Sequence, residues 1–171
     1  MTSTIAVGVS ACLLGEKVRY DGGHRLDCNV TDTLGRLILF VPVCPEVECG
    51  MSIPREPMRL EGDPAKPRLM TVDSRVDKTE EMASYCRARV GELANMELCG
   101  FVFKARSPSC GLIGVTVHKN GVPAGTGRGL FAAALVERFP FLPVEEEEGL
   151  SDPAVREKFV ERVLNHNNKE E

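Results

Sequence analysis

The 171-residue sequence predicts one α/β domain, a sandwich of helices on a mostly parallel sheet. Runs of strand-forming residues alternate along the chain with segments of helical periodicity. The run at 37–41 is continuously apolar, as is typical of a parallel strand that is buried on both faces. Hydrophobic residues make up 43% of the chain and charged residues 27%, a balance that is ordinary for a soluble globular domain with one core.

The N-terminal third predicts two strands that are joined by a long turn and a helix. Residues 5–9 form a short β-rich run, which we expect to be the first and central strand. The segment 19–24 contains Asp-Gly-Gly, which favours a turn, and no phosphate-binding glycine pattern follows the strand. A helix over 29–36 then leads into the strand at 37–41.

The middle of the chain changes from irregular structure to a long helix. Prolines are dense over 54–67, which predicts neither helix nor sheet there. A short edge strand is expected at 68–72. Apolar residues then recur at helical spacing up to Leu93, and Asp77 and Thr79 are equally placed to cap this helix.

The next segment predicts a strand and then a hairpin. Residues 98–104 are apolar and end in a loop that is rich in serine. Residues 115–118 and 122–124 flank Asn-Gly, the residue pair that two-residue hairpin turns prefer. The glycine-rich stretch at 125–129 is expected to be a flexible loop.

Two helices and one strand complete the prediction. A helix over 130–138 precedes a last strand at 141–144, and the glutamates at 145–148 are expected to form a solvated acidic turn. Ser-Asp-Pro at 151–153 supplies a cap and an early proline for the final helix. The tail at 165–171 is expected to fray.

Composition and charge exclude several classes of protein. A net charge of −4 argues mildly against a broad electrostatic grip on nucleic acid. The N-terminus lacks the basic region of a signal peptide, and no apolar run approaches the ~20 residues of a membrane span. We therefore expect a cytoplasmic protein without membrane contact.

Seven cysteines are many for such a chain, and the odd number argues against a disulfide framework. Without a Cys-x-x-Cys pair, a metal site has to be assembled from distant segments. Cys12, Cys44 and Cys110 each follow an apolar strand, and ligands bind at the carboxyl ends of strands in open α/β sheets. From spacing alone, buried thiols are an equally good interpretation. Cys49 is a candidate fourth ligand.

Four motifs in order resemble those of the domain-of-unknown-function family 523, which includes thiouracil desulfidase. They are VSACLLG at 9–15, RYDG at 19–22, VCPE at 43–46 and SPSCG at 107–111. The similarity runs from about residue 5 to residue 163. The C-terminal part resembles the branch in which this domain precedes a second one and which is linked to desulfuration of thiouridine.

The resemblance implies a Rossmann-like three-layer sandwich that holds a 4Fe–4S cluster through three cysteines. Carried over by motif, these ligands are Cys12, Cys44 and Cys110, and the fourth iron stays open to substrate. Cys49 lies outside the motif. Iron–sulfur clusters normally take four thiolates, and a soft iron suits a thiocarbonyl sulfur. The implied reaction is a non-redox hydrolysis that removes sulfur from a thiolated pyrimidine.

Three residues near these cysteines are candidates for the chemistry. Glu46 is the expected general base, and Ser107 is expected to position water or relay a proton. Ser109 is a candidate for binding substrate or a cluster sulfide. A solvated carboxylate and ordinary turn serines are the structural alternatives.

The expected substrate is thiouracil, a thiouridine nucleotide or a thiolated tRNA base, and the protein is a candidate homo-oligomer. The arginines at 55, 59 and 68 are candidates for contacting a nucleotide phosphate, although a solvated charged loop is more common. Two other functions stay open. One is a sulfur carrier with Cys110 as a nucleophile of lowered pKa, and the other is a structural metal module that includes Cys49.

Overall fold

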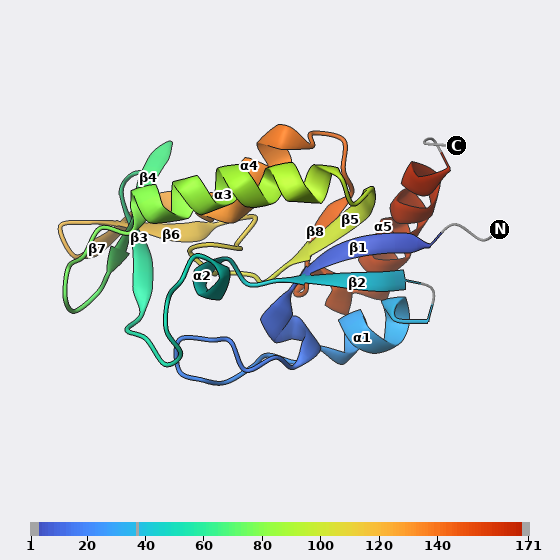
Figure 1. The fold of residues 1–171 in the computed structure, drawn as a ribbon, viewed down its shortest axis with the longest axis horizontal. Helices are drawn as coiled ribbons and strands as arrows, with labels where there is room; N and C mark the ends of the chain where they lie inside the picture. Colours follow the sequence, from blue (N-terminus) through green and yellow to red (C-terminus); the bar gives the residue numbers. More distant parts are fainter. Residues whose placement is uncertain (1–3, 37, 169–171) are drawn as a thin grey trace.

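The computed structural model describes residues 4–36 and 38–168 and contains the predicted parallel sheet. Sheet A has the strand order β2-β1-β5-β8, and its neighbouring strands are all parallel (Figure 1). Its strands are β1 (Ile5–Ser10), β2 (Ile38–Val43), β5 (Leu98–Phe103) and β8 (Val144–Glu146). The α/β class is confirmed, and β1 is a central strand as predicted. Residue 37, the predicted start of the second strand, lies outside the described residues.

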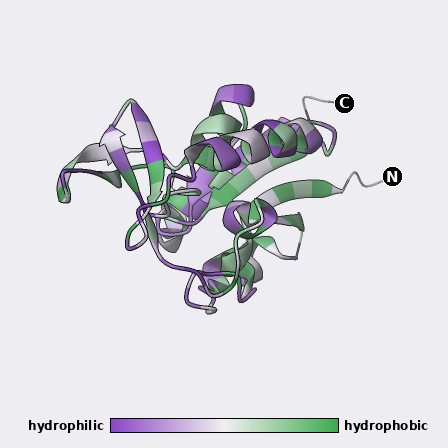
Figure 2. Ribbon diagram, turned by 60° about the vertical axis from the view of Figure 1, so that its left-hand side comes forward, coloured by the Kyte–Doolittle hydropathy of each residue, from purple (hydrophilic) through white to green (hydrophobic). Residues whose placement is uncertain are grey.

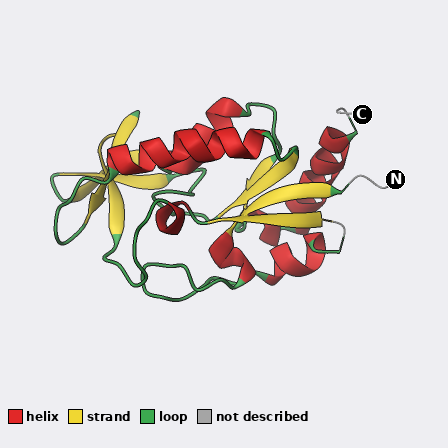
Figure 3. Cartoon of the chain, in the orientation of Figure 1, coloured by secondary structure: helices red, strands yellow, loops and turns green. Residues whose placement is uncertain are grey.

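A second, mixed sheet lies beside the first, and the sequence did not predict it (Figure 3). Sheet B has the strand order β4-β3-β6-β7, in which β3 and β6 are parallel and the outer pairs are antiparallel. Its strands are β3 (Met58–Asp63), β4 (Lys66–Thr71), β6 (Val115–Lys119) and β7 (Val122–Gly127). The predicted hairpin is confirmed as β6 and β7.

Two segments that were expected to be irregular are strands of sheet B. The proline-rich stretch 54–67 contains β3, because Pro64 falls in the turn and Pro67 lies on β4, an edge strand. Residues 125–127 belong to β7, the other edge strand, and are not a flexible loop. Edge positions tolerate proline and glycine because only one side of the strand is paired.

Helices cover both faces of sheet A. On one face, Val7 and Val9 of β1 pack with α1 (Cys28–Leu34) and α5 (Pro153–Asn167). Side chains on the opposite face of sheet A pack with α3 (Thr79–Ala94) and α4 (Leu130–Arg138). Figure 2 shows the hydrophobic stretches concentrated along the strands of this sheet. The assignment to a Rossmann-like type stays a prediction.

Local capping explains where the helices begin. The Asp27 carboxylate accepts a hydrogen bond from the Asn29 amide at 2.9 Å, so α1 begins at residue 28. The predicted cap of α5 is confirmed, because Asp152 accepts from the Ala154 amide at 2.8 Å. Asp77, rather than Thr79, accepts a bond from the first turn of α3.

The C-terminal segment differs from the prediction in three ways. The last strand begins at residue 144, and Phe141 is 89% exposed. The glutamates at 145–148 are not a solvated turn, because two of them lie in β8 and Glu147 is buried. Helix α5 continues to Asn167, so residues 165–167 do not fray, and residues 169–171 lie outside the described residues.

Candidate functional site

The three predicted strand-end cysteines surround one cavity of about 400 Å³. Cys12 lies in the short 3₁₀ helix η1 (Ala11–Leu14) after β1, and Cys44 directly follows β2. Cys110 lies in the loop after β5. In sheet A, β1 is flanked by β2 on one side and β5 on the other, so the chain order reverses at β1. Such switch points open a crevice at the carboxyl ends of the strands.

Burial controls the acid–base state of these thiols. It raises the pKa of Cys12 to about 11, although the nearby Lys104 ammonium acts in the opposite direction. Burial also raises the pKa of Cys44 and of Cys110, and a hydrogen bond with Ser10 offsets part of the effect at Cys110. Raised pKa values favour the protonated thiols in the free protein, and a metal centre that binds the sulfurs would displace these protons.

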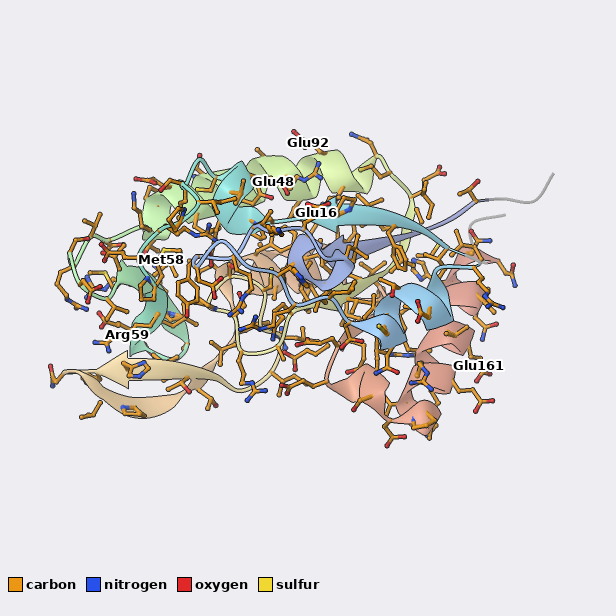
Figure 4. The ribbon with its side chains drawn as sticks, turned by 90° about the horizontal axis from the view of Figure 1, so that it is seen from below. Glu16, Glu48, Met58, Arg59, Glu92 and Glu161 are labelled. Carbon is orange, nitrogen blue, oxygen red and sulfur yellow. The ribbon has the colours of Figure 1, made fainter. Side chains whose placement is uncertain are left out.

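A short helix turns the chain after β2 and places Glu46 at the cavity. Cys44 is the N-cap of α2 (Pro45–Glu48), and proline suits the first helical position because its missing N–H has no helical partner. The Glu48 carboxylate accepts from the Cys44 amide at 2.7 Å. Arg89 of α3 pairs through Nε with Glu48 Oε1 at 3.0 Å and through Nη1 with Glu92 Oε2 at 2.8 Å. The first pair ties α2 to α3, and Figure 4 labels both glutamates. This helix is not among the elements predicted from the sequence.

Glu46, Ser109 and Ser107 form a hydrogen-bonded line along the cavity. The Ser109 hydroxyl donates to Glu46 Oε1 at 3.2 Å, and the Ser107 and Ser109 hydroxyl oxygens lie 3.1 Å apart. Ser107 also accepts from the Cys110 amide at 3.0 Å. Ser109 therefore connects the other two residues predicted from sequence, and the line offers a path for a proton between Ser107 and the carboxylate.

Two glutamates, one at the end of β8 and one directly after it, hold the serine-rich loop in place. Glu147 accepts from the Ala105 amide at 2.7 Å and pairs with the Lys104 ammonium at 2.7 Å. Glu146 accepts from the Leu112 amide at 3.0 Å. These contacts fix both ends of the loop that carries Ser107, Ser109 and Cys110. A run of identical glutamates gives no signal of which one is buried, so the sequence did not identify Glu147.

The start of α4 holds the middle of the same loop. The first amides of a helix have no helical partner, and here the Phe131 and Ala132 amides donate to the Ser109 carbonyl at 3.0 Å and 3.2 Å. The Leu130 amide donates to the Pro108 carbonyl at 3.1 Å. Gly129 permits this approach, because a Cβ there would lie 2.6 Å from the Ser109 carbonyl oxygen.

The arginines that were candidates for phosphate contact are all ion-paired within the protein. Arg55 pairs with Glu46, Arg59 with Glu61 and Arg68 with Asp77. A different arginine lines the cavity with a free donor. Nη1 of Arg19 is buried and has no hydrogen-bond partner among the described residues, and the Asp21 carboxylate lies 3.9 Å from it. This cation suits an anionic or carbonyl-bearing guest.

The donor set around the cavity is better suited to an iron–sulfur cluster than to a single metal ion. Within the described residues, no three Cys, His, Asp or Glu side chains are grouped tightly enough to hold one metal ion. Cysteines that bind a cubane each take a different iron, so they stand farther apart than the ligands of a single ion. The three thiols come from three different strand ends and line one cavity, an arrangement that is compatible with separate irons of a cluster.

The other two hypotheses are less consistent with the structure. The sulfur carrier requires a Cys110 thiol of lowered pKa, whereas burial raises the pKa of this thiol. The closed metal module requires Cys49, which ends α2, packs against the hydrophobic core and is not among the residues that line the cavity.

Among the described residues, no helix is long and apolar enough to cross a membrane.

Comparisons with known proteins give a consistent result. The model of the 2-thiouracil desulfurase family matches residues 7–147. An uncharacterized protein of Bacillus subtilis, YbbK, is 28% identical over 148 residues, which cover 82% of this chain and 95% of that protein. A solved structure of the [4Fe-4S]-dependent thiouracil desulfidase TudS superposes with a TM-score of 0.72 at 30% identity, covering 91% of this chain and 99% of that one.

Proposed function

The chain belongs to the 2-thiouracil desulfurase family, and from that premise we propose that it is an iron–sulfur-dependent desulfidase acting on a small thiolated pyrimidine. The observation that carries the proposal is the cavity in which Cys12, Cys44 and Cys110 meet the hydrogen-bonded line of Glu46, Ser109 and Ser107. The volume of this cavity, about 400 Å³, falls within the usual range for small-molecule sites. A tRNA substrate and a homo-oligomer stay predictions.

The three cysteines would hold a 4Fe–4S cluster and leave one iron without a protein ligand. When bound, the cluster supplies a thiophilic Lewis acid for the thiocarbonyl sulfur. Because the thiols are protonated in the free protein, loading the site releases protons. Arg19, with its free Nη1, is placed to bind the oxygen of the pyrimidine ring or another electron-rich group of the substrate.

In this reaction, residues of the chain orient the attacking water and transfer its protons. Ser107 orients a water molecule toward the thiocarbonyl carbon. As the water attacks, a proton of the water is transferred through the Ser107 and Ser109 hydroxyls to Glu46 Oε1. The same carboxyl then returns the proton to the departing sulfur. The C=S bond is replaced by C=O, water supplies the oxygen and two protons, and sulfide leaves as H₂S or HS⁻. The reaction needs no electron donor or acceptor.

Protein that is purified and reconstituted without oxygen tests the proposal. We expect about four irons and four acid-labile sulfides per chain, and release of sulfide from 2-thiouracil or 4-thiouracil. Cys12→Ala, Cys44→Ala and Cys110→Ala lose the iron, whereas Cys28→Ala, which changes an exposed cysteine, keeps it. Cys49→Ala also keeps the iron, which separates the open cluster from a closed four-cysteine site.

Glu46→Gln separates chemistry from cluster binding. We expect this variant to keep its iron content and absorption spectrum and to lose about 10²- to 10⁴-fold in kcat, the usual range for a general base. A protein that stays colourless and free of iron after anaerobic reconstitution would rule out the proposed function. Full turnover by Glu46→Gln would remove Glu46 from the mechanism.

A further inference from the structure

Arg55 is buried against the cavity and makes contacts that the proposed chemistry does not yet use. Its side chain is 8% exposed and that of Glu46 is 13% exposed. Nε donates to Glu46 Oε2 at 2.8 Å, and Nη2 donates to the same oxygen at 2.5 Å. Both contacts fall on Oε2, so Oε1 stays available for the Ser109 hydroxyl.

This division of contacts gives the carboxylate one orientation. A guanidinium is rigid and planar, and two donors on one oxygen restrict rotation of the carboxyl group. Oε1 is thereby directed along the line to Ser109 and Ser107. A freely rotating carboxylate would present either oxygen to Ser109 and would spend time in unproductive arrangements.

The same arginine also holds the loop that follows η1. Nη2 donates to the Val18 carbonyl at 2.9 Å, and the Arg55 amide donates to the Tyr20 carbonyl at 2.8 Å. The Val18 carbonyl is in turn 3.9 Å from the Cys44 thiol, to which it offers an acceptor. Val18, Arg19 and Tyr20 all line the cavity. Arg55 therefore links this loop to α2, which carries Glu46.

We propose that Arg55 is a positioning residue that orients Glu46 through Oε2 and holds the 16–23 loop against the thiol cavity. The proposal rests on the assignment of Glu46 as the base of the desulfidase reaction. Arg55 itself does not touch the reacting atoms in this account. It acts through the carboxylate on one side and through the Val18 carbonyl on the other.

Kinetics of single and double variants test the action through Glu46. Arg55→Met is expected to lower kcat about a hundredfold with little change in KM, and Arg55→Lys to recover part of the loss, because an ammonium replaces the charge without the fork. In a Glu46→Gln background, Arg55→Met should cause no further loss beyond about twofold. Losses that multiply in the double variant would overturn the positioning role.

Arg59→Met is the matched control. Arg59 lies on β3 and pairs with Glu61 at 2.7 Å, and it is not itself one of the residues that line the cavity, although its neighbour Met58 is (Figure 4). The substitution therefore removes an arginine–glutamate hydrogen bond without touching Glu46. We expect kcat and iron content to stay at wild-type values. If Arg59→Met matches the loss in Arg55→Met, general destabilisation explains both variants.

A measurement without turnover tests the second half of the proposal. In cluster-free protein, Arg55→Met should speed hydrogen exchange in the 16–23 loop and alkylation of Cys44, and should leave exchange in α5 unchanged. Unchanged exchange and alkylation would overturn the loop-holding role. If the wild type releases no sulfide from thiouracil, the proposed function fails, and these exchange and alkylation rates still decide whether Arg55 holds the loop.

Discussion

At the scale of single residues, the site depends on where each carboxylate finds its partner. Glu46 Oε2 accepts from Arg55 and Oε1 accepts from Ser109. The two contacts together pair the negative charge of the carboxylate and set its orientation. Glu147 pairs with Lys104 and accepts the Ala105 amide, and its side chain is only 8% exposed. Both carboxylates are nearly enclosed and fully partnered, which is the condition under which buried charge is tolerated.

Glu147→Ala should reduce the free energy of unfolding by about 3 kcal/mol, because it leaves the Lys104 ammonium and a buried amide without their partner. Urea denaturation of the variant and the wild type measures the difference. Glu148→Ala is the control: its carboxylate and its partner Arg106 are both at least half exposed, so the change should stay below about 1 kcal/mol. Equal losses in the two variants would contradict the structural role of Glu147.

At the scale of elements, the serine-rich loop acquires its shape from a neighbouring helix. The loop has little regular structure of its own, and its carbonyls satisfy the free amides at the start of α4. This arrangement satisfies polar groups on both sides and places Ser109 and Cys110 beside the cavity. Around this loop, a Cβ at Gly129 or Gly111 would lie within 2.7 Å of a backbone atom.

Gly129→Ala should displace the loop, because its Cβ would lie 2.6 Å from the Ser109 carbonyl carbon and 2.9 Å from the Cys110 amide nitrogen. We expect a loss of about 1–3 kcal/mol in unfolding free energy and reduced iron uptake on reconstitution. Gly91→Ala is the control, since a Cβ on this α3 glycine meets nothing within 4 Å. It should stabilise the protein by about 0.5–1 kcal/mol. Wild-type iron uptake in Gly129→Ala would show that the loop can adjust.

At the scale of the whole molecule, the cavity is lined by residues of both sheets. Sheet A supplies the strand ends with the cysteines, and Pro57 and Met58 at the start of β3 line the same cavity. Helix α3 extends from the region of sheet B to that of sheet A and contacts α2 and β4 (Figure 1). The stability of sheet B therefore bears on the shape of the site.

Protonation of Glu61 on β3 should lower the free energy of unfolding in acid. Hydrogen bonds from Arg75 and then Arg59 hold the pKa of Glu61 at about 2, below its ordinary value of 4.5. A lowered native pKa stabilises the folded state above pH 4.5, and this contribution is lost as the pH falls from 4.5 to 2. Glu61→Gln should flatten the decline in unfolding free energy over that window, measured by urea titration at each pH. A wild-type slope in Glu61→Gln would contradict this role.

Most elements of sheet A, the helices around it and the cysteines that line the cavity could be predicted from the sequence. Strand ends, caps such as Asp152 and cysteine positions are encoded in short windows, where periodicity and turn chemistry act locally. The four motifs added the family, which the matched model bears out. The chain order predicted that Cys12, Cys44 and Cys110 lie at strand ends.

The pairing of segments that are far apart in the chain could not be predicted from the sequence. The pairing of β3 with β6 creates sheet B, and it depends on strands that are more than fifty residues apart in the chain. Glu147 is buried because it meets the Ala105 amide, 42 residues away. Arg55 is a positioning candidate because folding brings it between Glu46 and Val18. Such choices depend on competition among many distant partners, and no local window of sequence records which partner wins.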